Sequence, residues 1–162
     1  MEIKDKIVPL LQEQFPETNF EVTDFRGDLK IKFDASLILP VTNFLKNNSE
    51  LKFNMCEDVT AIDWATKKNR FTVVYHIYSL ENKFRLRLAC DVAESHPHIE
   101  SIVPVWKSAN WYERETYDMY GIKFDNHPDP RRMYMPEEYE YYPLRKEYPL
   151  MGIPGDLTLP KK

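Results

Sequence analysis

The sequence contains few of the residues on which metal centres and phosphate-binding loops depend. Its 162 residues include two cysteines, Cys56 and Cys90, which lie far apart in predicted strands. An iron–sulfur cluster generally takes about four cysteine thiolates, so we expect no cluster and interpret both cysteines as buried, reduced thiols. Only four glycines occur, and none belongs to a phosphate-binding motif. We therefore expect no nucleotide-binding site in this chain.

An excess of basic residues and long apolar runs are also missing. Lysine and arginine number 22 against 26 aspartates and glutamates, giving a formal net charge of -4 with both signs interspersed. A nucleic-acid-binding domain usually has a basic face, so we expect no nucleic-acid partner. No apolar run reaches the roughly 18 residues of a membrane-spanning helix, and the N-terminal residues do not resemble a signal peptide. We expect no direct insertion into a membrane.

The histidines and paired carboxylates do not form a recognisable catalytic motif. His96 and His98 flank a proline in a predicted loop, where no third metal ligand follows at a regular spacing. Glu113 and Glu115 are two positions apart on a predicted helix, so they face different directions and make a poor acid–base pair. His127 lies between aspartates and prolines. It is the remote candidate for an independent hydrolase or metalloenzyme, and we predict no catalytic residue.

The first part of the chain predicts two helices separated by a β-hairpin. Apolar residues recur at helical spacing over residues 2–15, and Pro9 within that pattern predicts a helix that is kinked or begins later than the pattern. Residues 20–25 and 29–33 are typical of two strands, joined by a turn at Gly27. A second helix is expected from residue 37 or 40 to residue 46.

The middle of the chain predicts strands, and a third helix follows. Residues 71–78 are rich in β-branched and aromatic side chains, and in residues 84–88 arginines alternate with apolar residues. The third helix is expected to begin at an N-cap, Asn110, with Glu113 completing a capping box, and to end at Gly121. This pattern indicates an α+β domain over residues 1–122, with a mixed or antiparallel sheet and helices on one face.

The remaining residues, 123–162, lack helical or strand periodicity. They are rich in proline, tyrosine, methionine and arginine, whereas ordinary linkers are rich in small polar residues. We predict an extended C-terminal tail with few internal hydrogen bonds, whose apolar surface lies against its own domain or a partner, and for residues 131–150 we favour the partner.

Several short blocks of charged and aromatic residues, between about residues 50 and 150, occur in the order typical of one family. The blocks are Asp63, Arg70-Phe71-x-Val73-Val74-Tyr75, Ser79-Leu80, Arg85-Leu86-Arg87, Trp111-x-Glu113-Arg114-Glu115, Asp118-Met119-Tyr120-Gly121-Ile122, His127-Pro128, Arg131-Arg132 and Pro143-Leu144-Arg145-Lys146. Together they resemble the C subunit of NADH:quinone oxidoreductase, the 30 kDa subunit family of respiratory complex I.

The chain departs from the family pattern at three positions. Asn126 replaces a glycine before His-Pro, and this change is mild because asparagine tolerates a positive φ. Pro130 replaces a leucine. Tyr141 replaces a glycine two residues before the Pro-Leu-Arg-Lys block, and it predicts a locally altered turn.

The resemblance implies a non-catalytic subunit of the peripheral arm of proton-translocating NADH:quinone oxidoreductase. It implies that the chain braces two partners, the quinone-site (D) subunit and the iron–sulfur (B) subunit. It places FMN, iron–sulfur clusters and quinone in partner subunits, and no cofactor in this chain. The expected location is the cytoplasmic side of the inner membrane, or the matrix side in a mitochondrion. An equivalent subunit of a related membrane-bound hydrogenase, or of an oxidoreductase fed by ferredoxin or F420, is the alternative.

The residues expected to contact partners are the charged and aromatic residues of these blocks. Arginine can form bidentate pairs with carboxylates, and tyrosine presents a ring to an apolar groove and a hydroxyl to its polar rim. The predicted set is Trp111, Glu113, Arg114, Glu115, Asp118, Tyr120, His127, Arg131, Arg132, Tyr134, Tyr142, Leu144, Arg145, Lys146 and Tyr148.

Overall fold

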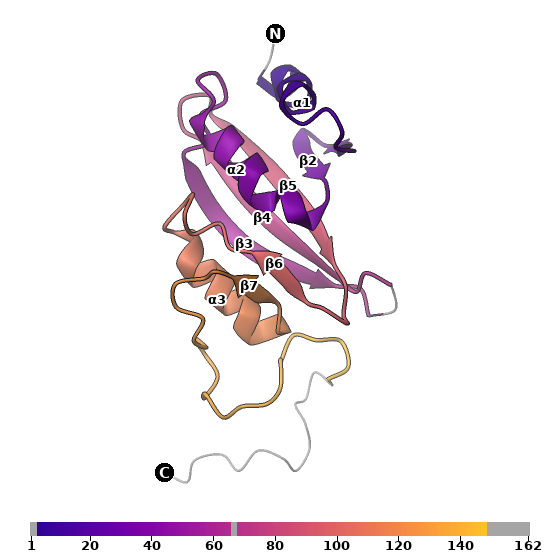
Figure 1. The fold of residues 1–162 in the computed structure, drawn as a ribbon, viewed down its shortest axis with the longest axis vertical. Helices are drawn as coiled ribbons and strands as arrows, with labels where there is room; N and C mark the ends of the chain where they lie inside the picture. Colours follow the sequence, from indigo (N-terminus) through magenta and orange to yellow (C-terminus); the bar gives the residue numbers. More distant parts are fainter. Residues whose placement is uncertain (1–2, 66–67, 149–162) are drawn as a thin grey trace.

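The computed structural model describes residues 3–65 and 68–148, and its centre is a five-stranded sheet in the order β1-β2-β5-β4-β3. Helices α1, α2 and α3 lie over the same face of this sheet (Figure 1). The elements are α1 (Ile3–Gln14), β1 (Glu21–Phe25), β2 (Asp28–Lys32), the 3₁₀ turn η1 (Ala35–Leu37), α2 (Ile38–Asn47), β3 (Met55–Asp63), β4 (Phe71–Ser79), β5 (Phe84–Val92), β6 (His98–Glu100), α3 (Ala109–Tyr120) and β7 (Lys123–Asp125). The predicted α+β class is confirmed.

The sheet is mixed because of one parallel pair. β1 and β2 form an antiparallel hairpin, and β3, β4 and β5 form an antiparallel meander. β2 and β5 are parallel neighbours, so the chain leaves β2, crosses through α2 to the far edge and returns along the meander.

Alternation along the strands separates a buried face from a polar one. Ile31, Tyr75 and Leu88 are neighbours in the register, and each is 0% exposed beneath the helices. Side chains at the intervening positions, such as His76 and Arg87, point to the opposite face, as the alternation in residues 84–88 predicts. None of the helices in the described part of the chain covers that opposite face.

The N-terminal elements confirm the hairpin and correct the first helix. The hairpin turns at Arg26 and Gly27, whose φ angles of 56° and 89° are those of the tight turn that favours glycine. Helix α1 runs without interruption through Pro9, an exposed residue, while Ile7 and Leu11 on its other side are 0% exposed. Burial of that apolar face compensates for the hydrogen bond that proline cannot donate.

A second, smaller sheet pairs residues 98–100 with residues 123–125, the predicted start of the tail. Strands β6 and β7 pair in parallel, with Ile99 opposite Phe124 and both side chains buried. Residues 123–125, which we assigned to the tail, are therefore paired with the domain. None of the helices within residues 3–65 and 68–148 is long and apolar enough to cross a bilayer.

Candidate partner-binding surface

The start of helix α3 differs from the prediction. The helix begins at Ala109 after an N-cap, Ser108, whose side chain makes no capping hydrogen bond. Glu113 is 0% exposed and instead accepts hydrogen bonds from Ser101 Oγ (2.6 Å) and the Ile102 amide (2.8 Å). The predicted capping box is wrong. The spacing of a capping box does not show whether the glutamate bonds to the end of its own helix or, as here, to residues 101 and 102.

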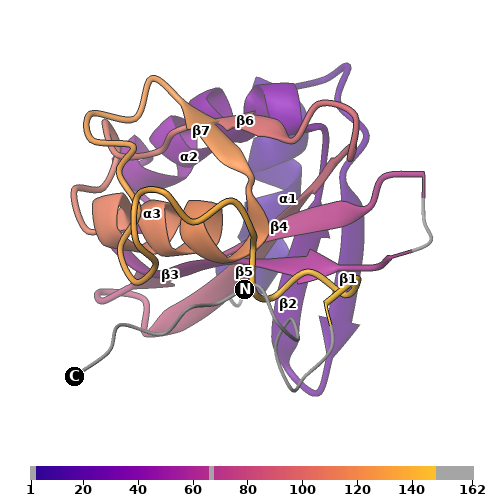
Figure 2. The ribbon, with the colours of Figure 1, turned by 90° about the horizontal axis from the view of Figure 1, so that it is seen from below.

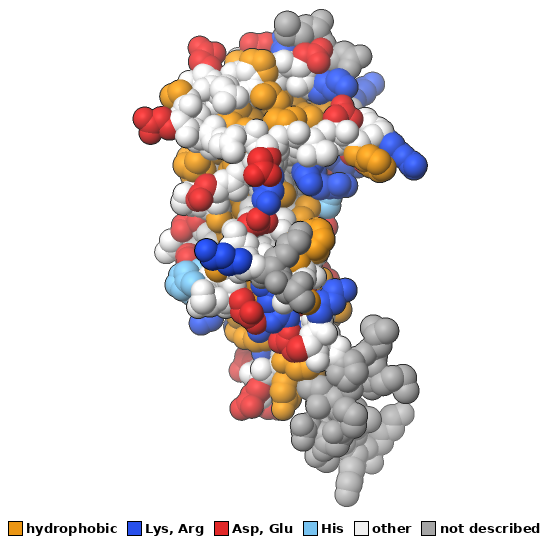
Figure 3. All heavy atoms as spheres, turned by 90° about the vertical axis from the view of Figure 1, so that its right-hand side faces the viewer, with side chains coloured by type: hydrophobic (Ala, Val, Ile, Leu, Met, Phe, Trp, Pro, Cys, Tyr) orange, Lys and Arg blue, Asp and Glu red, His pale blue; other side chains and the backbone are white. Residues whose placement is uncertain are grey.

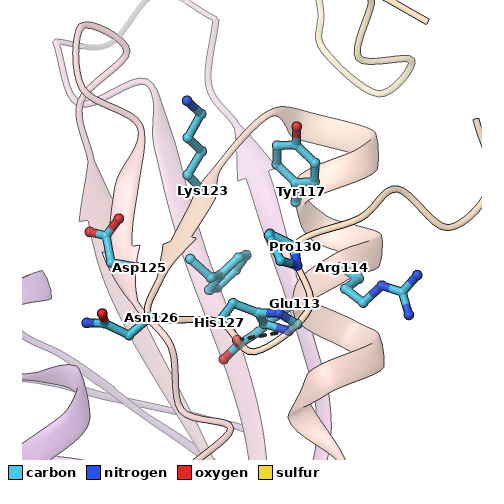
Figure 4. Close-up of a pocket in the computed structure, with 9 residues that line it drawn as sticks. Glu113, Arg114, Tyr117, Lys123, Asp125, Asn126, His127 and Pro130 are labelled. Atoms are coloured by element: carbon cyan, nitrogen blue, oxygen red, sulfur yellow. Dashed lines mark ion pairs between the residues drawn. The ribbon is translucent and has the colours of Figure 1, made fainter. Parts of the chain in front are cut away.

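Glu113 also lies beside His127, and both side chains are almost fully buried. Glu113 Oε2 and His127 Nε2 are 3.8 Å apart, with 0% and 2% of the side chains exposed (Figure 4). Burial raises the pKa of Glu113 to about 7, even though Ser101 and Ile102 donate to it. Burial also lowers the pKa of His127. His127 Nδ1 accepts the Asp129 amide (3.0 Å), so its proton resides on Nε2, which faces the Asn110 carbonyl.

This pair lines a cavity of about 410 Å³ between α3, β7 and the loop that follows β7. Arg114 and Tyr117 contribute from α3, and Phe124 and Pro130 contribute from the other wall (Figure 4). In residues 3–65 and 68–148, no group of three or more His, Cys, Asp or Glu side chains is arranged to bind a metal ion. The geometry gives no support to a metalloenzyme centred on His127.

The two cysteines lie in the core, as the sequence predicts. Cys56 and Cys90 are buried and free, and burial raises the pKa of Cys56 to about 12. Burial raises the pKa of the Cys90 thiol as well, so both thiols are protonated at neutral pH and are poor nucleophiles.

Asp118 holds the loop of residues 131–135 against α3. Its side chain is 0% exposed, and Oδ2 accepts the backbone amides of Met133, Tyr134 and Met135 at 3.1, 2.7 and 3.0 Å. Oδ1 pairs with Arg132 Nη1 at 2.7 Å. Burial alone would raise the pKa of Asp118, but these donors outweigh it, and the pKa lies below its usual value. The carboxylate thus replaces the hydrogen bonds that this irregular backbone cannot make to itself.

Three arginines that were predicted to contact a partner form their hydrogen bonds and ion pairs within the chain. Arg114 Nε donates to the Arg131 carbonyl (2.9 Å), and its guanidinium lies 5.0 Å from the Trp111 ring centroid. Arg132 is almost buried between Asp118 and the Tyr142 ring. Arg131 remains exposed on its side chain and pairs with Asp129, a neighbour in the same loop.

The next stretch of the tail is attached to the end of α3. Arg145 Nε donates to the Tyr120 carbonyl (2.7 Å), and its guanidinium lies 4.6 Å from the Tyr142 ring centroid. Both side chains pass over Gly121. A Cβ there would come within 2.6 Å of the Arg145 guanidinium and the Tyr142 ring, and the φ of +74° also favours glycine.

The buried ion pair between Arg70 and Asp63 holds the end of the described tail against the sheet. Arg70 makes a bidentate pair with Asp63 at 2.9 and 2.8 Å, at the adjacent ends of β4 and β3. Asp63 also accepts the Lys146 amide (2.8 Å), and Arg70 pairs with Glu147. Arg70, hydrogen-bonded to Asp63, holds the pKa of that carboxyl well below its usual range. Spacing in the sequence could not predict the contact between Arg70 and Glu147, because these residues are more than 70 positions apart.

Residues 126–148 therefore run around α3 and attach to it (Figure 2). The expectation of few internal hydrogen bonds is wrong for this segment. Three large apolar side chains remain exposed in this region. Trp111 on α3 is 59% exposed, and Tyr134 and Leu144 on residues 126–148 are 58% and 51% exposed. We call these three residues the tail face.

Other predicted residues occupy intermediate or exposed positions around these anchors. Glu115 and Tyr120 are half-buried on α3, Lys146 is exposed, and Tyr148 lies 5.7 Å from the ring centroid of Tyr141. Tyr141 also lies 5.5 Å from the Tyr139 ring centroid, so the replacement of the family's glycine gives an aromatic cluster. Asn126 has a φ of 60°, which confirms its expected backbone conformation.

Comparison with known proteins identifies the family. The family model described as "Respiratory-chain NADH dehydrogenase, 30 Kd subunit" matches residues 31–154. The chain belongs to this family. It is 44% identical over 152 residues to the C subunit of the NADH-quinone oxidoreductase of Geobacter metallireducens, covering 93% of this chain and 92% of the relative. It is 45% identical over 148 residues to the C subunit of Geotalea uraniireducens, covering 91% and 89%.

Solved structures share the fold. A trypsin-resistant fragment of Nqo5 has a TM-score of 0.65 and 25% identity, and the match covers 78% of this chain and 98% of that fragment. A chain of the membrane-bound sulfane sulfur reductase, an archaeal respiratory membrane complex, has a TM-score of 0.76 at 21% identity, covering 93% and 88%. The resemblance found in the motifs is confirmed, and the chain is a subunit of an NADH-quinone oxidoreductase complex.

Proposed function

We propose that this chain is a non-catalytic, cofactor-free brace in the peripheral arm of a proton-translocating NADH:quinone oxidoreductase. Membership of the family, over residues 31–154, is the observation that carries the proposal. The geometry supports it, because the most buried charged groups serve the fold. Glu113 joins α3 to Ser101, Asp118 joins α3 to the tail, and Arg70 joins the adjacent ends of β3 and β4.

The partners in this proposal are the quinone-site (D) subunit and the iron–sulfur (B) subunit, which would hold the quinone and cluster chemistry. FMN would belong to a further subunit. The tail face is the surface offered to the quinone-site partner, since Trp111 and Tyr134 are of the kinds that dominate binding energy in interfaces. Docking the tail in advance on α3 lowers the conformational entropy lost on assembly.

The proposed location is the cytoplasmic side of the inner membrane, or the matrix side in a mitochondrion. The subunit would be held there by its partners, with no segment of its own in the bilayer. The second candidate is an equivalent subunit of another respiratory complex, which the fold shared with the sulfane sulfur reductase favours. The names of the curated relatives favour the NADH-linked complex over it.

The test replaces the tail face in the intact complex. The triple variant Trp111→Ala, Tyr134→Ala and Leu144→Ala removes the exposed apolar side chains and leaves Asp118 and Arg145 in place. Loss of well-packed interface anchors costs about 2 kcal/mol or more each, so the variant should largely disappear from the purified complex. NADH oxidation with an artificial acceptor at the flavin should persist while quinone reduction falls.

The matched control is Phe25→Ala, at an exposed apolar residue in the last position of β1. This variant should be incorporated normally. Normal incorporation and full quinone reduction by the triple variant would contradict the tail face as the binding surface. Purification of this chain in a complex that oxidises an electron donor other than NADH, and that lacks an NADH-oxidising subunit, would favour the second candidate.

A further inference from the structure

The sheet face opposite the helices is a second surface with the properties of an interface. Val74 and Ala89 form an apolar floor, 5% and 2% exposed, and Ile62 and Trp64 stand at its edge, each 41% exposed. A hollow of about 650 Å³ lies over this floor. We call this surface the open sheet face. Its lining residues are Glu21, Lys30, Lys32, Thr60, Ile62, Trp64, Asn69, Thr72, Val74, His76, Arg87, Ala89 and Asp91.

Two cations lie next to each other in the middle of this face. Lys30 of β2 and Arg87 of β5 are register partners in the parallel pair, so their side chains emerge side by side. Figure 3, turned by 90° from Figure 1, shows basic side chains beside hydrophobic ones in the upper half of the molecule. Like charges at neighbouring strand positions destabilise a sheet.

Three carboxylates lie on or near this face, and Glu21 is opposite Lys32 in the register of β1 and β2. Asp91 pairs with Lys32 (2.7 Å) and accepts from the Thr72 hydroxyl (2.7 Å). Asp58 Oδ2 lies 3.5 Å from His76 Nδ1. Within residues 3–65 and 68–148, no carboxylate lies within salt-bridge distance of Lys30 or Arg87.

A neutral acceptor occupies only part of the Arg87 guanidinium. Arg87 Nε donates to His76 Nε2 at 3.0 Å, which orients the guanidinium without neutralising it. An arginine guanidinium presents donors in a fork that matches a carboxylate, and the adjacent Lys30 adds a second positive charge. A carboxylate placed between the two would relieve their repulsion and form charge-assisted hydrogen bonds.

We infer that the open sheet face docks a segment of a second protein subunit that presents a carboxylate flanked by apolar side chains. The carboxylate meets Lys30 and Arg87, and the apolar side chains cover Val74, Ala89 and the exposed edges of Ile62 and Trp64. This surface lies across the sheet from α3 and the tail face, so both can be occupied at once. The inference therefore goes beyond the proposed role of the tail.

The test compares the isolated subunit with the assembled complex. Lys30→Gln removes one of two repelling charges, so the melting temperature of the isolated subunit should stay the same or rise. In the complex the same change removes a charged contact to the partner, and retention of the subunit at increasing salt should fall by about 10-fold. Lys107→Gln, at an exposed lysine just before α3, is the matched control and should leave both measurements unchanged.

A photo-crosslinking residue at Thr60 in the intact complex then identifies the occupant. A crosslinked peptide from another subunit, containing aspartate or glutamate, is the expected product. A crosslink to phospholipid, a crosslink to a second copy of this chain, or no crosslink at all would overturn the inference. Unchanged retention of Lys30→Gln would overturn it as well. A photo-crosslinking residue at Tyr134 tests the tail face separately. Absence of a crosslink from Tyr134 to a partner subunit would count against the proposed function and not against the open sheet face.

Discussion

Replacement of Asp118 by alanine tests whether one buried carboxylate holds the tail on the domain. The change removes the acceptor of three backbone amides and leaves Arg132 almost buried without its partner. Breaking a buried ion pair from one side costs about 3–5 kcal/mol, and hydrogen bonds to a charged group contribute about 1.5–3 kcal/mol each. These contributions do not add, because the loop can detach and expose its amides to water.

We therefore expect Asp118→Ala to lower the free energy of unfolding by about 3 kcal/mol, measured by urea denaturation of the isolated subunit. Limited trypsin digestion should cut the variant at Arg131, Arg132 or Lys146 faster than the wild type, because the detached segment becomes accessible. Glu115→Ala is the control, since this carboxylate on the same helix is half-buried and should change stability by less than about 0.5 kcal/mol. A loss below about 1 kcal/mol with unchanged digestion would refute the role given to Asp118.

Three further predictions follow from other parts of the structure. Glu113→Gln should remove a pH dependence of the free energy of unfolding. In the wild type the folded state keeps a proton at Glu113 that the unfolded chain releases, so stability falls as the pH rises from about 4.5 to about 7. The variant should gain on the wild type by up to about 3 kcal/mol over that range, and parallel pH profiles would contradict this. Gly121→Ala should cost about 2 kcal/mol or more in urea denaturation, because its Cβ meets side chains and its φ is positive. Gly27→Ala, with an equally positive φ and open space around it, should cost only about 1 kcal/mol, and equal losses would contradict the close approach at Gly121. The purified subunit should contain no stoichiometric metal, flavin or iron–sulfur cluster by metal analysis and absorption spectroscopy, and spectroscopic ligation by Cys56 or Cys90 would contradict this.

The regular elements could be predicted from the sequence because their signals are local. Alternation in residues 84–88 assigned the two faces of β5 correctly, and Gly121 marked the end of α3, where its φ is +74°. The parallel pairing of β2 with β5 has no such signal, since it depends on how the whole meander returns across the sheet. For the same reason the contact of β6 with β7 was missed.

The roles of charged residues were harder to predict. Arginines and tyrosines of the tail have the composition of an interface, but composition does not show which carbonyl or ring a guanidinium meets. Arg132 and Arg145 are satisfied within the chain by Asp118 and by the Tyr120 carbonyl. Tyr134 and Leu144 could be assigned to the exposed side of the tail only when these anchors had fixed which side faces outward.

Quinone reduction by a complex in which this chain is truncated after Asn126 tests the bracing role most directly. This truncation keeps β7 and its pairing with β6, and circular dichroism of the isolated variant verifies that the domain is folded. We predict that the truncated subunit is lost from the complex and that quinone reduction falls, while NADH oxidation at the flavin continues. Normal assembly with full quinone reductase activity would contradict the claim that this subunit braces the quinone site through its tail.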